Sequence, residues 1–236
     1  GNGSSITNSF TPANSGTLIL GTSGGTQTYN GGLTTTSVGG TVTVNGTINV
    51  NGANLVLGAV ILDSTTVLDI NEDNNSLSFT SFDGSSSNAD LTINIDGSFN
   101  LNNQIDIGSG DLVVNIDVDN DGVETLIVAR GPRASSITYN GSAASNDSLT
   151  GPNLETTWTI TAENTGALAG NGFTNFANLT GGTGDDTFTF SNTGSLTGLL
   201  DGGTHSNADT ANYSALGAQT IDLGGNAGGV IRIENV

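Results

Sequence analysis

The chain has 236 residues, of which 36 are Gly and none is Cys or Met, so disulfide bonds and thiolate metal sites are excluded. Its 22 acidic side chains face three basic ones, Arg130, Arg133 and Arg232, which gives a formal net charge of -19. This balance excludes recognition of a nucleic-acid backbone, which needs several cations, and it argues against binding to an anionic membrane surface. No apolar run approaches the ~20 residues of a membrane span, so the sequence also predicts no membrane insertion.

Apolar residues come in short bursts that alternate with Thr, Asn or Asp, which is the period of a half-buried β-strand. In chain order, these bursts lie at residues 18–20, 42–44, 48–50, 55–57, 60–62, 67–68, 77–79, 91–95, 105–107 and 112–118. Turn pairs of the Asn-Gly or Asp-Gly type separate them, as at Asn45-Gly46, Asn51-Gly52 and Asp83-Gly84. No stretch keeps a helical period, so the sequence predicts an all-β chain.

The strands are short and the turns close together, as in residues 41–52, where two strand-plus-Asn-Gly blocks lie six residues apart. This rhythm predicts a parallel β-solenoid, or β-helix, of short strands with corners rich in Gly and Asn. A hairpin at each Asn-Gly is the alternative. The solenoid predicts a buried column formed by Val42, Val44, Ile48, Val50, Leu55, Leu57, Ile61, Ile93, Ile95, Ile105, Val114 and Ile116.

The composition changes near residues 130–134, where two Arg residues flank a Pro. We therefore expect a β-helix segment over residues 1–132 and a second β-solenoid segment over residues 133–236, continuous with the first. The second segment opens with the alternating residues 154–161, which contain the only Trp, and is Gly-rich thereafter. Trp158 is expected to be a core or coil-capping residue rather than a sugar platform.

The most specific chemical motif is residues 181–189, which match the calcium-binding nonapeptide G-G-x-G-x-D-x-U-x at every fixed position. Its glycines allow a tight turn with carbonyls directed at a cation, and Asp186, next to Asp185, supplies a carboxylate. A working site needs such turns in neighbouring coils, and the next candidate, residues 202–209, contains Asp209 but has two extra residues. The sequence leaves open both a Ca²⁺ site and a metal-free glycine corner.

A second acidic cluster places Asp117, Asp119 and Asp121 at positions 1, 3 and 5 of a loop with Gly122 at position 6, as at the start of an EF-hand loop. The bidentate Glu expected at position 12 is absent, because Val128 occupies that position. The alternative is an ordinary Asp-Gly turn with solvated carboxylates.

Residues 25–33 and the blocks that follow them resemble large secreted bacterial β-strand-repeat proteins, the filamentous-haemagglutinin-like adhesins. Residues 158–161, 172–188, 200–203 and 213–216 resemble a glycine- and aspartate-rich module of the RTX type found in such proteins. The resemblance implies a β-helix, secretion, and a place at the bacterial cell surface or in an extracellular matrix. It identifies no ligand.

These observations favour a structural module of an extracellular filament, matrix or long adhesin, which assembles with itself or with adjacent repeats. The joint is expected at solenoid edges or through a donated terminal strand, with the assembly residues Leu18, Ile19, Leu20, Val230, Ile231 and Ile233. One alternative is a calcium-dependent, ligand-binding adhesin domain. Another is a polysaccharide-active β-helix enzyme, which the scarcity of Lys and Arg disfavours, and no catalytic residue is singled out.

Overall fold

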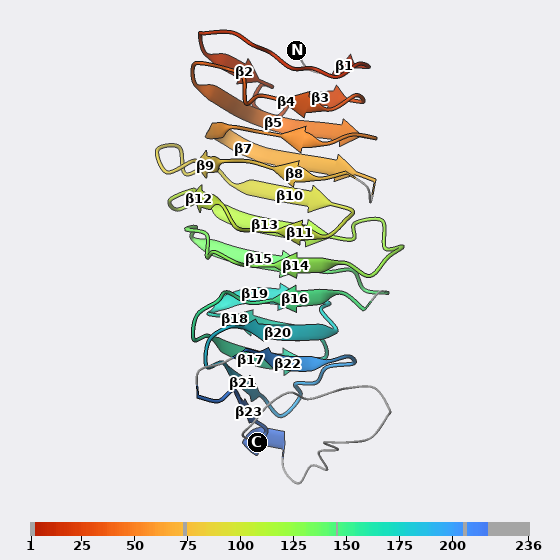
Figure 1. The fold of residues 1–236 in the computed structure, drawn as a ribbon, viewed down its shortest axis with the longest axis vertical. Coiled ribbons are helices and arrows are strands. Elements are labelled where there is room, and N and C mark those ends of the chain that lie inside the picture. Colours follow the sequence, from red (N-terminus) through yellow and green to blue (C-terminus); the bar gives the residue numbers. More distant parts are fainter. Residues whose placement is uncertain (1–2, 73–74, 145, 205–206, 217–236) are drawn as a thin grey trace. The chain divides into compact units, whose positions relative to one another are not determined.

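The computed structural model describes residues 3–72, 75–144, 146–204 and 207–216, and almost all of their regular structure is β-strand (Figure 1). In this part of the chain there is no α-helix, and a 3-10 turn at Ser214–Leu216 follows the last strand. None of its helices is long and apolar enough to cross a membrane. Because most strand pairs are parallel and successive coils stack in register, the predicted parallel β-solenoid is confirmed.

The chain forms two compact units. Unit 1 comprises Gly1–Phe99, Asn103–Asp119 and Pro132–Ile137, and unit 2 comprises Asn100–Asn102, Asn120–Gly131 and Thr138–Val236. Strands β11 (Phe99–Asn100) and β15 (Ser136–Asn140) contain residues of both units. The segment boundary expected at residue 132 stays a prediction.

Unit 1 has three rows of stacked parallel strands. The first row runs β1, β3, β5, β7, β10 and β13, the second runs β4, β6 and β8, and the third runs β2, β5, β7, β9 and β12. Their bounds are β1 Ser4–Ile6, β2 Leu18–Leu20, β3 Thr26–Tyr29, β4 Leu33–Thr34, β5 Val42–Asn51, β6 Leu55–Val56, β7 Ala59–Asn71, β8 Leu77–Ser78, β9 Ser81–Asp83, β10 Leu91–Ile95, β12 Gln104–Asp106 and β13 Asp111–Ile116.

Strands β5 and β7 are long enough to belong to two rows, because each continues around a corner. The register between them shifts between Val44 and Gly46, and Gly46 takes a φ of 68°. A Cβ on Gly46 would lie 2.4 Å from the carbonyl oxygen of Gly25, so only glycine fits this bend. The hairpin alternative is wrong for Asn45-Gly46, which lies inside β5 between parallel strands.

The core of unit 1 consists of columns of apolar side chains contributed by successive strands. One column stacks Ile48, Leu68, Ile93 and Val114 on β5, β7, β10 and β13, and each of the four is no more than 1% exposed. Of the twelve residues predicted to be buried, eleven lie in the core. Ile61 is the exception at 44% exposed, because its neighbours Val60 and Leu62 point inward and the alternation of a strand turns Ile61 outward.

Asparagine ladders run along the outside of the same strands. The Asn115 side-chain amide donates to Asn94 Oδ1 at 2.7 Å, and the Asn94 amide donates to Asp69 Oδ1 at 3.3 Å. In a neighbouring ladder the Asn71 amide donates to Asn51 Oδ1 at 2.8 Å, and the Asn51 amide donates to Asn30 Oδ1 at 3.1 Å. Each rung supplies the acceptor for the next amide, so identical side chains stabilise one another when coils stack in register.

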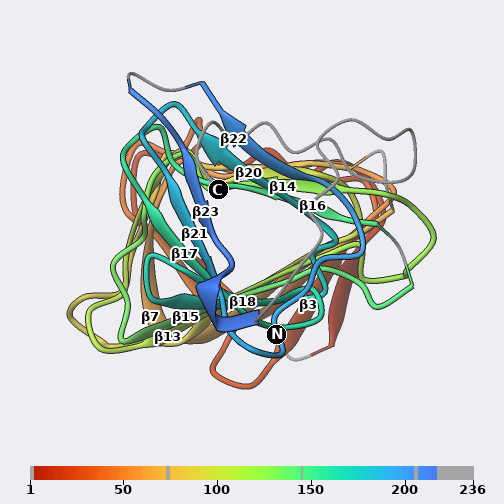
Figure 2. The same cartoon turned by 90° about the horizontal axis from the view of Figure 1, so that it is seen from below.

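Unit 2 contains two parallel rows, β14–β16–β20–β22 and β17–β21–β23, whose strands overlie one another in the end-on view (Figure 2). Between β17 and β19 the chain turns back, so β18 is antiparallel to both neighbours. The bounds are β14 Thr125–Ile127, β16 Ser148–Thr150, β17 Thr157–Ala162, β18 Thr165–Leu168, β19 Asn171–Thr174, β20 Asn178–Gly182, β21 Thr187–Phe190, β22 Leu200–Gly203 and β23 Thr210–Asn212.

Aromatic rings fill the core of unit 2. Trp158 is fully buried and stacks on Phe188 with their ring centroids 5.4 Å apart, while Phe173 meets it edge-on at 6.1 Å. Trp158 is therefore a core residue, as predicted.

The stacking predicts opposite responses to the loss of two isoleucines. Ile93→Ala removes a fully buried side chain and should lower the free energy of unfolding by about 2–5 kcal/mol. Ile61→Ala removes an outward side chain and should change it by less than about 0.5 kcal/mol. Urea denaturation of the two variants measures both values, and equal losses would contradict the orientation of β7.

Candidate metal centre

The two glycine-rich loops identified in the sequence lie in successive coils of unit 2. Before the loops, β20 pairs with β22 through Leu179–Leu200 and Gly182–Gly203, and after them β21 pairs with β23 through Thr187–Thr210. Loop 181–186 is therefore stacked on loop 202–209, of which residues 205–206 lie outside the described part. This is the arrangement that the nonapeptide motif requires, and the two extra residues of the second loop do not disturb the flanking register.

Asp186 is the most unusual side chain in this stack. It is 1% exposed, and neither of its carboxylate oxygens accepts a hydrogen bond of ordinary length and angle, although the backbone N–H and the hydroxyl of Thr156 lie close to it. A Cβ on Gly181 would lie 2.3 Å from Asp186 Oδ2, so the carboxylate fills space that only a glycine leaves open. A buried carboxylate without partners is costly unless it is protonated or binds a cation.

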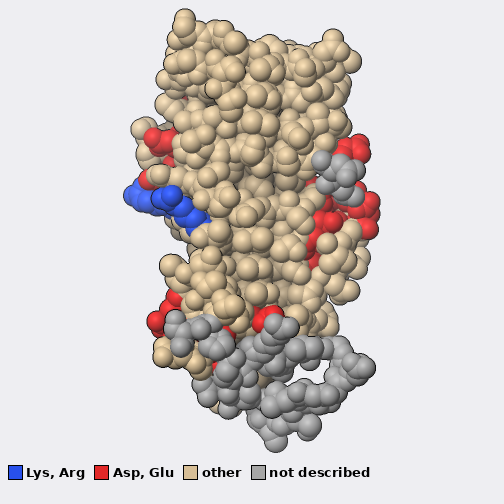
Figure 3. All heavy atoms as spheres, in the orientation of Figure 1, with Lys and Arg blue, Asp and Glu red and all other residues tan. Residues whose placement is uncertain are grey.

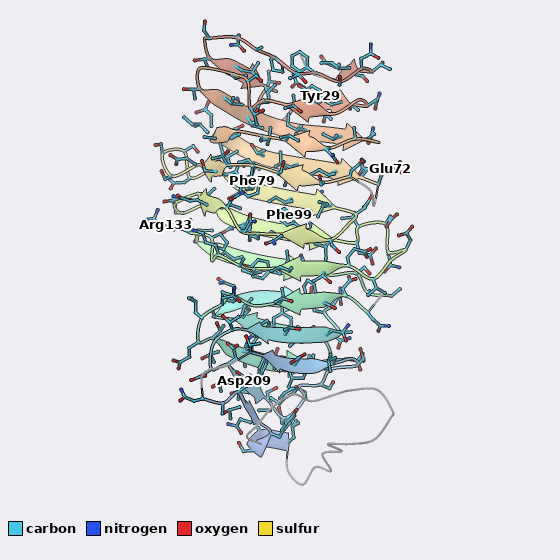
Figure 4. All side chains as sticks on the ribbon, in the orientation of Figure 1. Tyr29, Glu72, Phe79, Phe99, Arg133 and Asp209 are labelled. Atoms are coloured by element: carbon cyan, nitrogen blue, oxygen red, sulfur yellow. The ribbon has the colours of Figure 1, made fainter. Side chains whose placement is uncertain are left out.

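Asp209 occupies the corresponding place in the next loop, beside β21 and β23 (Figure 4). It is fully buried, and its Oδ1 accepts the backbone N–H of Asp186 at 2.8 Å. A Cβ on Gly202 would lie 2.2 Å from Asp209 Oδ2, which repeats the relation between Gly181 and Asp186. Two buried carboxylates are thus held in adjacent coils, each over the glycine that opens its own loop.

The electrostatics of Asp186 favour a neutral or cation-bound state of its carboxyl group. Burial raises the pKa of Asp186 to about 6, and the negative charge of Asp209 adds to the shift. The backbone N–H and hydroxyl of Thr156 in the preceding coil act in the opposite direction and lower this pKa, but they do not offset the burial. A divalent cation between the carboxylates would remove both causes of the shift.

Asp185, the third predicted ligand in this region, has a different role. Its Oδ1 accepts the backbone N–H of Asn207 at 2.8 Å, and its Oδ2 accepts the side-chain amide of Asn207 at 2.5 Å. Asp185 is only partly exposed, and it ties the two loops together. The geometry brings Asp186 and Asp209 together in the interior and leaves Asp185 at the edge of the stack.

The second predicted cluster is also brought together locally. Carboxylate oxygens of Asp117, Asp119 and Asp121 lie within 4.8 Å of one another. Asp117 is buried with a φ of 50°, whereas Asp119 and Asp121 are exposed. These oxygens could hold a cation, but the burial is confined to one residue. Val128, at the position of the missing Glu, is a core residue.

Sequence reasoning missed Asp147, which is fully buried in unit 2. Its Oδ2 accepts the N–H of Ser142 at 2.7 Å, and its Oδ1 accepts the N–H of Glu124 at 2.9 Å. Carboxylate oxygens of Glu124 and Asp147 also lie within 4.8 Å of each other. No spacing rule relates these two acids, because they come from loops 23 residues apart that stacking brings together.

Of the predicted assembly residues, Leu18, Ile19 and Leu20 form β2, where Leu20 is buried and Ile19 is 64% exposed. Val230, Ile231 and Ile233 lie outside the described residues. Comparisons with protein-family models, with curated proteins and with solved structures found no match.

The raised pKa predicts how Asp186 affects stability when no cation is present. An ordinary aspartate carboxyl has a pKa of 3.8, whereas the carboxyl of Asp186 has a pKa of about 6 in the folded chain. The stabilising contribution of the neutral form is therefore complete below pH 4 and is lost as the pH rises through 6. Asp186→Asn should raise the free energy of unfolding by about 1–3 kcal/mol at pH 8 in chelator and by much less at pH 4.

Urea denaturation at both pH values, with the exposed Asp63→Asn as a matched loss of one charge, measures this effect. Equal free energies of unfolding for the two variants at pH 8 would show that the buried carboxylate of Asp186 does not destabilise the fold.

Proposed function

We propose that this β-solenoid is a structural module of an extracellular bacterial filament, matrix or long surface adhesin, and that it is extended along its axis by further coils. The observation that carries the proposal is the first coil of unit 1. Strand β1 pairs with β3, Phe10 forms a parallel bridge with Leu33, and β2 pairs with β5. Within the described residues, no strand pairs with the other side of this coil.

The charge distribution supports stacking at this coil. Residues 1–62 contain no acidic or basic side chain, so all 22 acids follow from Asp63 onward. Figure 3 shows the N-terminal part of the molecule without charged atoms on the visible face. A chain with a net charge of -19 repels its copies at most surfaces, but a further coil can approach this edge without that repulsion.

The coil added at this edge is a repeat of a longer chain or part of a neighbouring subunit. Open backbone groups and an apolar column both favour such an addition. Donation of residues 230–236, which lie outside the described residues and which the sequence predicts to form a strand, is one form that the joint can take. The proposal assigns no catalytic role, since three Arg residues and no Lys offer little to bind and deprotonate an acidic sugar.

Negative-stain electron microscopy at rising protein concentration tests axial assembly. The wild-type chain should form filaments, and Ser5→Pro on β1 should prevent them. Ile6 accepts the N–H of Asn30, so by the alternation of a parallel pair Ser5 directs its own N–H to the open edge, where proline removes the donor. Ser5→Ala is the matched control and should form filaments as the wild type does.

Deleting residues 230–236 separates the two forms of the joint. Loss of filaments with a folded monomer supports strand donation, whereas normal filaments point to stacking of whole coils. Discrete particles of the wild-type chain at every concentration would contradict axial self-assembly.

A calcium-dependent adhesin domain is the second candidate, and the stacked loops with Asp186 and Asp209 favour it. Calcium takes oxygen ligands, and this pair offers two buried carboxylates in glycine-rich turns. In this second candidate function, bound calcium would make the C-terminal coils of the described region rigid, and those rigid coils would bind the ligand.

Thermal melting with excess calcium and with chelator tests the site. Calcium at 100 times its dissociation constant should stabilise the fold by about 2.7 kcal/mol, which corresponds to a rise in Tm of about 5–10 °C. Asp186→Asn should abolish the rise, while Asp63→Asn, which removes one exposed charge elsewhere, should retain it. Superimposable wild-type curves would leave both loops as metal-free turns.

A further inference from the structure

An exposed apolar column lies on the third row of unit 1, apart from both the open strand edge and the acidic loops. Parallel pairing places Ile19 of β2 beside Thr43 of β5, and Thr43 beside Ile61 of β7. Ile19 is 64% exposed and Ile61 is 44% exposed, and with Val118, which lies outside this row, they are the exposed large apolar side chains of unit 1 among the described residues. We call Ile19, Thr43 and Ile61 the isoleucine column.

The surroundings of the column are small and uncharged on one side and charged on the other. Thr41, directly before β5, and Ala59, at the start of β7, lie two residues before Thr43 and Ile61 and are exposed and neutral. Beyond Ile61 the row continues with Asp83, then Asp106, then Arg133. Asp63, exposed two residues after Ile61 on β7, also lies on this face. The face therefore has an uncharged end at Ile19 and Thr43, and its charged end begins beside Ile61.

The charged end is already satisfied within unit 1. Arg133 donates from Nη1 to Asp106 Oδ1 at 2.7 Å, and this hydrogen bond holds the pKa of Asp106 below its usual value. Arg133 itself projects outward from the strands (Figure 4). Asp83 Oδ1 accepts the N–H of Ser85 at 3.0 Å. The charged side chains of this row are thus occupied by contacts within unit 1, whereas the isoleucine column exposes apolar side chains to solvent.

We propose that the isoleucine column is the contact surface for a second copy of this chain, packed face to face with its solenoid axis antiparallel. The column is symmetric about Thr43, since an isoleucine stands one rung away on each side. A two-fold axis through Thr43 places Ile19 of each copy against Ile61 of the other, which is the self-complementary contact that such symmetry requires.

The charges select the orientation. If the solenoid axes of the two copies were parallel, each rung would meet the same rung of the other copy, so Asp83 would face Asp83 and Asp106 would face Asp106. In the antiparallel arrangement Asp83 lies one rung beyond the partner's Ile19, where the described chain has no strand paired beyond β2. Like charges are therefore opposed in one orientation and separated in the other.

The uncharged character of residues 1–62 also selects a copy of the chain as the partner. All the acids of this chain lie from Asp63 onward, so repulsion between two copies is smallest where their first 62 residues meet, with Asp63 and Asp83 at the border of the contact. At physiological salt the Debye length of about 8 Å exceeds the rung spacing of about 4.8 Å, so this preference is not screened out.

The contact is small. Three rungs of about 4.8 Å and strands of about three residues give on the order of 200 Å² per copy, against about 800 Å² per partner in a standard stable interface. An isolated pair is therefore weak, with dissociation in the high micromolar range or above. Because a coil added axially at β2 would lie opposite Asp83 of the partner, the antiparallel contact forms between chains whose first coil is free.

Sedimentation equilibrium from about 10 µM to 1 mM tests the pairing, in a Ser5→Pro background that blocks axial stacking. The weight-average mass of this parent should rise toward that of a dimer. Ile61→Asp and the milder Ile61→Ser should keep it at the monomer value. Thr92→Asp, an equal charge change at an outward position of β10, should pair as the parent does. Circular dichroism melting verifies that each variant is folded.

A charge exchange then tests the orientation. Ile19→Asp alone should abolish pairing, and Ile19→Asp combined with Ile61→Lys should restore it, because the antiparallel contact places each Asp against a Lys of the other copy. A parallel contact would oppose Asp to Asp and Lys to Lys, so a double variant that stays monomeric overturns the proposed arrangement.

A parent that stays monomeric up to 1 mM overturns the pairing itself, as does association that survives both Ile61→Asp and Ile61→Ser. Neither result bears on axial assembly, which electron microscopy of the chain with Ser5 intact decides independently.

Discussion

In-register parallel stacking is the constraint on which the rest of this structure depends. Backbone hydrogen bonds join each coil to the next, and they fix residues of equal position side by side at about 4.8 Å. A side chain at one position of a coil therefore lies directly beside the side chains at the same position of the neighbouring coils. The columns of Ile48, Leu68, Ile93 and Val114 inside and the ladder of Asn94 and Asn115 outside are the favourable consequences, because like side chains pack or hydrogen-bond with one another.

The same constraint makes like charges at equivalent positions destabilising. Where carboxylates occupy equivalent positions, as Asp83 and Asp106 do on β9 and β12, their negative charges are forced together. Arg133 relieves one of them in the next rung. Asp186 and Asp209 are brought together in the interior instead, where burial raises the pKa of Asp186 to about 6. This buried pair distinguishes the glycine-rich loops of unit 2 from the ordinary corners of the fold.

The two proposed modes of association follow from where the chain places its charges. Residues 1–62 build coils with no acidic or basic side chains, and both the open edge of β1 and β2 and the isoleucine column lie in them. The edge extends the solenoid along its axis, whereas the column faces sideways. The two surfaces differ in chemistry, since the edge offers backbone donors and acceptors and the column offers apolar side chains. A module with both could extend along its axis or pair sideways through different contacts, while its acidic remainder keeps other surfaces apart.

The order of the amino acids predicted the all-β class, the parallel solenoid and eleven of the twelve expected core residues correctly, because the alternation of apolar and polar residues is local and survives in the strands. The glycine-rich motifs also located Asp186 and Asp209. Contacts between residues of different coils could not be predicted in this way, because they depend on which coils are neighbours in the folded chain. Stacking placed Asp209 against the N–H of Asp186, brought Asp147 to Glu124, and reversed the chain at β18 between β17 and β19. Ile61 was assigned to the wrong face because it lies between two inward residues in an unbroken apolar run, where the sequence alone carries no alternation to read.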